Sequence, residues 1–182
     1  MTDERLLRLT ATHEASHAVV CLATGGEVDV ITVVPGEGYA GKMSPRLDND
    51  EMKSMLDMML PPGEPIVARK IAAEVRACAR RQIVEYVAGP VGEWTFLPGL
   101  SSSTGDRHRR ASHDLKLATA IARGISETEE AAATLLSAAR VEARDILVAN
   151  RPLVEAVAEA LVRHGSLRGD EIELIIDGSM AT

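Results

Sequence analysis

Aromatic residues make up only 2% of this chain of 182 residues, although 46% of its residues are hydrophobic. Strands favour aromatic and β-branched side chains, whereas alanine, of which the chain has 26, favours helices. The scarcity of aromatics therefore argues against an all-β sandwich or barrel. A chain of this length can bury a sizeable core without disulfides, so we expect residues 1–182 to form one mainly α-helical (α+β) domain.

Other classes of protein are disfavoured by what the sequence lacks. Two cysteines, Cys21 and Cys78, are too few for a disulfide framework, which favours a reducing, cytoplasmic location. No apolar run approaches the roughly 20 residues that a membrane span needs, and the first residues lack the profile of a signal peptide. The net charge of −7 offers no basic excess for nucleic acid. We therefore expect neither a membrane nor a nucleic acid as a partner.

Hydrophobic periodicity and turn signals predict a helical bundle with a small β-hairpin or sheet beside its first helix. The β-branched run Val28–Val34, a glycine-rich turn and a shorter returning strand near Tyr39–Met43 predict the hairpin. Gly89-Pro90 is expected to interrupt a helix, and residues 100–110 have the composition of a loop. The helices are predicted over residues 4–23, 48–60, 66–87, 111–123, 127–149, 152–163 and 170–176.

The first predicted helix carries an H-E-x-x-H motif, His13-Glu14-Ala15-Ser16-His17. Residues four apart lie on one helix face, so both imidazoles can reach a single ion. Imidazole nitrogens are zinc ligands, and a carboxylate that does not bind the ion, such as Glu14, can take a proton from zinc-activated water. Burying these polar groups in an apolar helix would be costly without a partner. The motif therefore predicts a metal site, with zinc as the ion and Glu14 as the general base.

A catalytic zinc ion needs a third protein ligand, which can come from anywhere in the fold. Spacing alone does not select it. Besides the glutamates, the candidates are His108, His113, His164, Asp106 and Asp114.

Several segments together resemble the peptidase domain of the FtsH family, the zinc proteases normally fused to an AAA+ ATPase. Residues 13–20 resemble that family's metal helix, and Ser103-Thr104-Gly105 followed by Asp114-Leu115 resembles the segment that supplies its third ligand, an aspartate. The resemblance thus implies Asp114 as the third ligand. The other similar segments, in the same order as in the family, are residues 30–35, 39–41, 118–123, 143–147, 150–151, 161 and 169–172.

The family resemblance implies a zinc-dependent endopeptidase. One catalytic zinc ion would be held by His13, His17 and Asp114, with water in the fourth position and Glu14 as the catalytic residue. His113 stands where the family has asparagine and is a competing ligand. We favour Asp114, because the similarity from Asp114 onward has no gap and neighbouring helical residues point about 100° apart.

The sequence departs from the family in two larger ways. Residues 106–110 form an insertion before the third ligand, and no Walker A motif or ATPase domain is present. We therefore expect an enzyme that is not itself ATP-driven and cleaves flexible or unfolded polypeptide. A separate ATPase or adaptor is a conceivable partner, and we expect a monomer or small homo-oligomer.

Two alternatives to an endopeptidase stay open. The chain could be a catalytically inactive pseudo-protease that acts as a binding or scaffold module. The intact Glu14 argues against this alternative, and the insertion at residues 106–110 argues for it. The chain could also be a metallohydrolase with a non-peptide substrate, because the motif specifies only activated water.

Two further features each have two interpretations. The strand Val28–Val34 could be a sheet edge that binds an extended peptide, as the resemblance favours, or half of a hairpin that covers the core. Glu93 falls where the family has an acidic residue. We expect it to be a solvated glutamate at a helix end, with a role as hydrogen-bond partner of a metal-binding histidine as the alternative.

Overall fold

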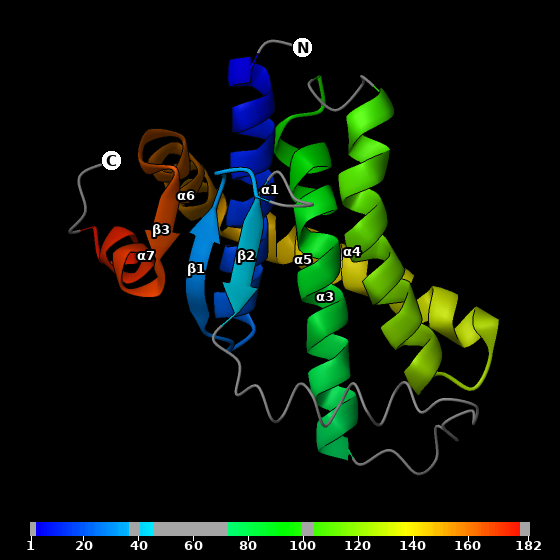
Figure 1. The fold of residues 1–182 in the computed structure, drawn as a ribbon. Helices are drawn as coiled ribbons and strands as arrows, with labels where there is room; N and C mark the ends of the chain where they lie inside the picture. The colour runs from blue at the N-terminus through cyan, green and yellow to red at the C-terminus, as the bar shows by residue number, and fades with distance from the viewer. Residues whose placement is uncertain (1–2, 37–40, 46–72, 100–103, 179–182) are drawn as a thin grey trace.

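The computed structural model describes residues 3–36, 41–45, 73–99 and 104–178. A mainly helical fold with a small sheet was predicted, and the structure confirms it (Figure 1). The helix predicted over residues 48–60 lies outside the described residues. The elements are α1 (Asp3–Ala23), β1 (Val28–Thr32), β2 (Lys42–Pro45), α3 (Ala73–Phe96), α4 (Thr104–Ile125), α5 (Glu129–Ala149), α6 (Arg151–His164), β3 (Ser166–Arg168) and α7 (Gly169–Ile176).

Helix α1 lies at the centre of the fold because apolar residues cover most of its surface. Figure 1 shows it between α6 and α3, with the sheet across one face. Several of its apolar residues are at most 1% exposed, and they include Ala11, Ala15, Ala18, Val19 and Val20. A helix that is apolar on all sides is surrounded by other elements. The polar side chains that α1 carries are therefore buried, and they need partners inside the protein.

Helices α1 and α3 cross at close range because small residues face each other. Gly92 of α3 lies against Ser16 of α1, so a Cβ atom at position 92 would collide with the Ser16 Oγ atom. The Ser16 hydroxyl donates a hydrogen bond to the carbonyl of Thr12, 2.6 Å away, which satisfies it within α1. Small side chains at positions 16 and 92 thus allow α3 to approach the helix that carries the motif.

The sheet has the strand order β2-β1-β3, and both pairings are antiparallel. Ile31 of β1 pairs with Met43 on one side and with Leu167 on the other. Since β1 is hydrogen-bonded along both sides, the hypothesis that Val28–Val34 is an edge for an extended peptide is wrong. Ile31 and Leu167 are buried, so the sheet covers the core. β3 was not predicted, because Ser166–Arg168 is too short to show an alternating pattern.

Helix α3 continues through Gly89-Pro90, where the sequence predicted an interruption, and ends at Phe96. Proline has a backbone angle that suits a helix, but it removes one N–H donor and crowds the preceding turn. Pro90 is fully buried, so its packing against the core offsets that loss. The predicted break is therefore wrong, and Glu93 lies inside a helix.

Helix α4 begins at Thr104, so the loop predicted over residues 100–110 is wrong from Thr104 onward. Serine, threonine and glycine in this stretch have modest helix propensity, which is why the sequence favoured a loop. Packing of α4 against α3 outweighs that propensity. Asp114 consequently lies well inside a long helix, which fixes its direction.

The later helices begin and end close to their predicted bounds because their terminal signals are local. The side chain of Thr128 caps α5 by accepting a hydrogen bond from the backbone N–H of Ala131 at 3.1 Å. Helix α6 ends at His164 and is followed by the capping residue Gly165, whose φ of 77° is readily adopted only by glycine. The start of α5 and the end of α6 thus lie within two residues of their positions predicted from the sequence.

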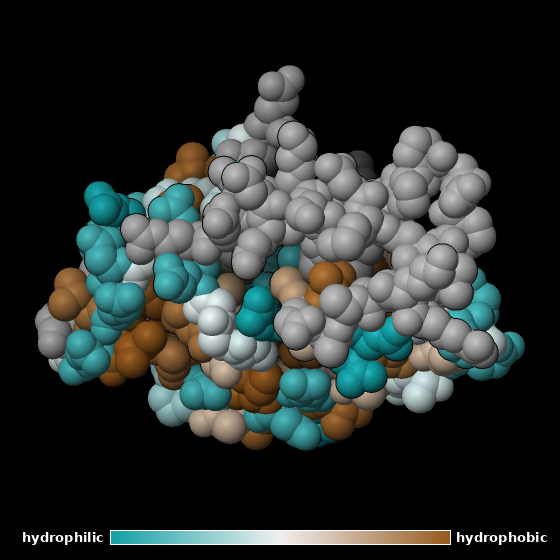
Figure 2. All heavy atoms as spheres, turned by 90° about the horizontal axis from the view of Figure 1, so that it is seen from below, coloured by the Kyte–Doolittle hydropathy of each residue, from teal (hydrophilic) through white to brown (hydrophobic). Residues whose placement is uncertain are grey.

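The described surface mixes hydrophilic and hydrophobic residues in small groups, as Figure 2 shows for one face. Exposed apolar side chains that are scattered singly are ordinary on protein surfaces. Within the ranges that the structure describes, no helix is both long and apolar enough to cross a membrane. The large hydrophobic side chains exposed in these ranges are Val34, Trp94, Val141, Val148, Leu174 and Ile176.

Candidate metal centre

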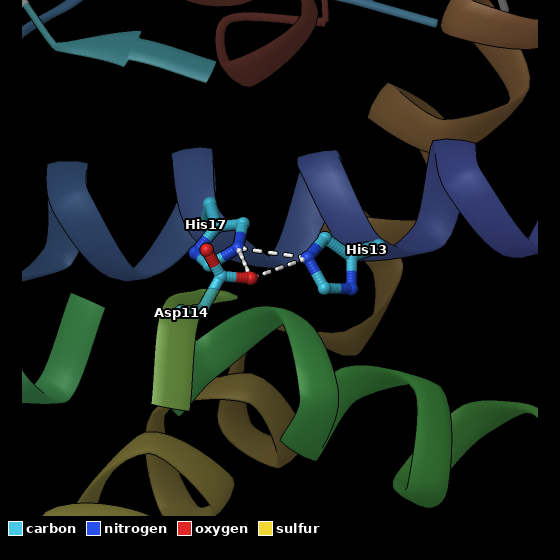
Figure 3. A group of neighbouring side chains, drawn as sticks. All are labelled: His13, His17 and Asp114. Atoms are coloured by element: carbon cyan, nitrogen blue, oxygen red, sulfur yellow. Dashed lines mark hydrogen bonds and ion pairs between the residues drawn. The ribbon is translucent and has the colours of Figure 1, made fainter. Parts of the chain in front are cut away.

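Three side chains with metal-binding atoms converge beside α3. Figure 3 shows His13 and His17 on α1, with Asp114 reaching them from α4. The Nε2 atoms of the two histidines are 3.0 Å apart. The Asp114 Oδ2 atom lies 3.0 Å from the His13 Nε2 atom and 3.5 Å from the His17 Nε2 atom. This His-His-Asp group could hold a metal ion.

The spacing of these three atoms fits a tetrahedral ion. Nitrogen and oxygen ligands at about 2.0–2.1 Å from a tetrahedral zinc ion lie about 3.3 Å from one another. The observed separations of 3.0, 3.0 and 3.5 Å lie on both sides of that value. Two imidazoles and one carboxylate also form a donor set that a catalytic zinc ion accepts. The residues present therefore fit such an ion.

The second nitrogen of each imidazole is held by a fixed hydrogen-bond acceptor. The His17 Nδ1 atom lies 2.7 Å from the backbone carbonyl oxygen of Glu85, and the His13 Nδ1 atom lies 2.6 Å from the Glu93 carboxylate. A carbonyl or carboxylate oxygen only accepts, so each Nδ1 atom carries the hydrogen and donates it. In each neutral ring the lone pair is then on Nε2, which is the atom that faces the converging group.

Glu93 is a buried partner of the centre, and the prediction of a solvated glutamate is wrong. The residue is 2% exposed and accepts its hydrogen bond from a histidine 80 positions earlier in the chain. Because α3 continues past Pro90, Glu93 faces α1 where the sequence suggested a helix end in solvent. A carboxylate behind a metal-binding imidazole orients the ring and raises its basicity. The alternative interpretation of Glu93 is the one that the geometry supports.

In the absence of an ion, the interactions between the histidines and the carboxylates shift the pKa values of His13 and Asp114 in opposite directions. Burial alone would lower the pKa of His13, but hydrogen bonds to Asp114 and Glu93, with the charge of Glu14, raise that pKa to about 10. Burial would likewise raise the pKa of Asp114, but its interactions with His13 and His17 hold that pKa well below its ordinary value. A proton on the His13 Nε2 atom therefore bridges the ligand atoms when no cation does.

Glu14 lies next to this group and is 6% exposed. A Cβ atom at Gly41 would lie 2.7 Å from the Glu14 Oε1 atom, so the carboxylate lies against the backbone that leads into β2. The charge of Glu14 also contributes to the raised pKa of His13. The carboxylate thus lies between α1 and the start of β2, near enough to His13 for its charge to act on that imidazole.

The competing ligands whose side chains the structure describes, His113 and His164, are not brought to the same place. His113 precedes Asp114 on α4 but is exposed, whereas the Asp114 side chain is 18% exposed and directed at the histidines. His164 is exposed in the last turn of α6. The side chains of Asp106 and His108 lie outside the described residues. Among the described candidates, the structure therefore joins Asp114 to the motif.

Sequence reasoning missed three contributions from α3. The backbone carbonyl of Glu85 holds His17, and Gly89 lies directly against both imidazoles. Tyr86 lies near Asp114: burial first, and then the charge of Asp114, raises the pKa of its hydroxyl group. Gly89 lies about one helical turn after Glu85 and Tyr86 and about one turn before Glu93. A continuous helix through Pro90 is the signal that would have placed them on one face.

Comparison with protein-family models finds none that matches this chain, and comparison with curated proteins finds no match either.

Proposed function

We propose that this protein is a zinc-dependent endopeptidase similar to the peptidase domain of the FtsH family, acting on flexible or unfolded polypeptide. The observation that carries the proposal is the convergence of His13, His17 and Asp114 at ligand spacing, together with the buried carboxylate of Glu14, whose charge acts on His13. Each half of that arrangement has a separate use. Three protein ligands leave one position on a tetrahedral ion for water, and a neighbouring carboxylate can accept the proton of that water.

The proposed ion is zinc, because two imidazoles and one carboxylate match its catalytic sites. When bound, zinc would lower the pKa of a coordinated water to about 7 and polarise a carbonyl group. Two hydrogen bonds prepare the ligands for it. The Glu93 carboxylate and the Glu85 carbonyl hold the Nδ1 hydrogens of His13 and His17, so both Nε2 lone pairs are directed at one point.

Glu14 is the proposed general base. Its carboxylate would accept a proton from the attacking water and pass that proton to the leaving amine nitrogen of the cleaved peptide bond. The burial of Glu14 keeps the carboxylate in a fixed place, since a buried side chain adopts few rotamers. A site with a purely structural ion would have no use for a carboxylate in this position.

A polypeptide substrate suits the elements next to Glu14. Among the described strands β2 is an outer one, and Gly41, directly before β2, lies against the Glu14 carboxylate. An extended peptide that pairs with an outer strand is held by backbone hydrogen bonds, which do not depend on its sequence. Such pairing would bring peptide bonds close to the general base. We therefore favour a peptide over a small-molecule substrate.

The test compares the wild-type protein with Glu14→Gln on labelled casein, an unstructured protein substrate, in the presence of zinc. We expect the wild-type protein to cleave it, and the variant to lose at least 100-fold in rate while keeping one zinc per chain. His113→Ala is the matched control and should cleave at the wild-type rate, because His113 is exposed. Zinc binding without cleavage by the wild-type protein would instead support the alternative of an inactive binding module.

The cytoplasmic location and a partner ATPase or adaptor stay predictions from the sequence. Neither is needed for cleavage of casein, because that substrate is already unfolded. A dependence of cleavage on a separate ATPase would emerge only with folded substrates. Light scattering would test the expected monomer or small homo-oligomer.

A further inference from the structure

Gly89 of α3 faces both histidines of the motif directly. A Cβ atom at Gly89 would lie 2.5 Å from the His17 Nε2 atom, 2.6 Å from the His13 Cε1 atom and closer still to the His13 Nε2 atom. Carbon and nitrogen atoms that are not bonded do not approach so closely, so any other residue at position 89 would push both imidazoles aside. The space that a side chain at position 89 would need is thus occupied by the two nitrogen atoms that are proposed to bind the ion.

The arrangement of the helices explains why this position matters. α1 and α4 both pack on α3, one on each side, as Figure 1 shows. His13 and His17 come from one of these helices, and Asp114 comes from the other. The three side chains therefore meet across the surface of α3. A side chain on α3 at that place would stand between the ligands.

Gly92, one turn further along α3, also faces α1 but has a different neighbour. A Cβ atom there would collide with the Ser16 Oγ atom, and it would lie 2.7 Å from the Ser16 Cβ atom. Ser16 is not a member of the metal-binding group. The two glycines can therefore be compared directly. Gly89 lies against the proposed ligand atoms, whereas Gly92 lies against Ser16, where α1 and α3 pack.

We propose that Gly89 is a positioning residue of the metal centre, whose missing side chain allows the two Nε2 atoms to converge on one ion. This inference rests on the proposed function only for the identity of the ion. Gly92, by contrast, serves the close packing of α1 and α3. Substitution of Gly89 by alanine should weaken metal binding strongly without unfolding the protein, because the imidazoles can rotate away from a methyl group. Substitution of Gly92 should weaken folding without affecting the bound ion.

The experiment measures zinc affinity by competition with a chromophoric chelator, and unfolding temperature in EDTA, for wild-type protein, Gly89→Ala and Gly92→Ala. We expect Gly89→Ala to bind zinc at least 100-fold more weakly with an unchanged far-ultraviolet circular dichroism spectrum. Gly92→Ala should keep wild-type zinc affinity, and its unfolding temperature should fall. Adding Ser16→Gly to Gly92→Ala should restore that temperature. Wild-type zinc affinity in Gly89→Ala would overturn the proposal.

A second comparison covers the case in which Gly89→Ala fails to fold. Removing both imidazoles with His13→Ala and His17→Ala should make Gly89→Ala tolerable, because the three atoms nearest to the added Cβ atom all belong to those rings. The triple variant should then unfold in EDTA at the temperature of the double variant. A large further loss in the triple variant would show that Gly89 serves helix packing, and would overturn the inference. Zinc binding by a wild-type protein that cleaves nothing would contradict only the proposed function.

Discussion

His13 and Glu93 are 80 residues apart in the chain, yet the His13 Nδ1 atom donates a hydrogen bond to the Glu93 carboxylate at 2.6 Å. Both side chains are at most 6% exposed. A charge-assisted hydrogen bond in such surroundings is stronger than one in water, and it fixes which nitrogen of the ring carries the hydrogen. The arrangement of a carboxylate, a histidine and a metal ion recurs in zinc enzymes.

Replacing Glu93 with glutamine should weaken zinc binding by about 10–100-fold, the usual cost of losing such a partner. The amide of Glu93→Gln can still accept from the Nδ1 atom, but it no longer provides the negative charge that makes the ring a better ligand. Zinc affinity measured against a chelator checks this. Glu173→Gln, which changes an exposed glutamate of α7, is the control and should bind zinc as the wild-type protein does. An unchanged affinity in Glu93→Gln would make the contact merely structural.

The motif itself was accessible from the sequence because its geometry is local. His13 and His17 are four residues apart, and the helix period alone puts them on one face. Asp114 was reached only through a family resemblance, because nothing local connects it with a helix about a hundred residues earlier. The apolar residues of α1 likewise predicted a buried helix, which the structure confirms.

The contributions of α3 could not be predicted because they depend on how helices cross. Glu93 was misassigned when Gly89-Pro90 was interpreted as a helix end, since the cost of an internal proline is local and the packing that offsets it is not. The role of Gly89 depends on the direction in which a missing Cβ atom would point. The Glu85 carbonyl that holds His17 belongs to the backbone, which a sequence pattern does not identify.

The assignment of Asp114 as the third ligand, in place of His113, predicts opposite effects of the two substitutions on zinc content. Asp114→Ala should remove stoichiometric zinc, because the Asp114 Oδ2 atom is within 3.5 Å of both Nε2 atoms. His113→Ala should leave the zinc content unchanged, because that side chain is exposed. Zinc content per chain after dialysis measures both variants. Zinc that survives Asp114→Ala and is lost from His113→Ala would reverse the assignment.

The stability of protein stripped of metal should depend on pH through the same group. The folded state raises the pKa of His13 from 6.5 to about 10, so its contribution to stability is complete below pH 6.5 and is lost as the pH rises toward 10. The folded state lowers the pKa of Asp114 from 3.8, so its contribution is present above pH 3.8 and is lost in stronger acid. Between these limits both contributions are present.

We therefore expect the unfolding temperature in EDTA to be highest between about pH 4 and pH 6.5 and to fall toward pH 10. The fall should be smaller in His13→Asn, which cannot carry the shared proton. Calorimetry at a series of pH values measures both proteins. Equal falls in the two proteins would assign the pH dependence to groups outside the metal centre.

Zinc should reverse this trend, because the ion replaces the proton on the His13 Nε2 atom and its affinity rises as that proton becomes easier to remove. At a free zinc concentration of 100 times the dissociation constant, binding adds about 2.7 kcal/mol to the free energy of unfolding. For a chain of this size that corresponds to a rise of roughly 5–10 °C in unfolding temperature. The rise should grow between pH 6 and pH 8 and vanish in Asp114→Ala. A rise of equal size in Asp114→Ala would place the stabilising zinc at a site other than His13, His17 and Asp114.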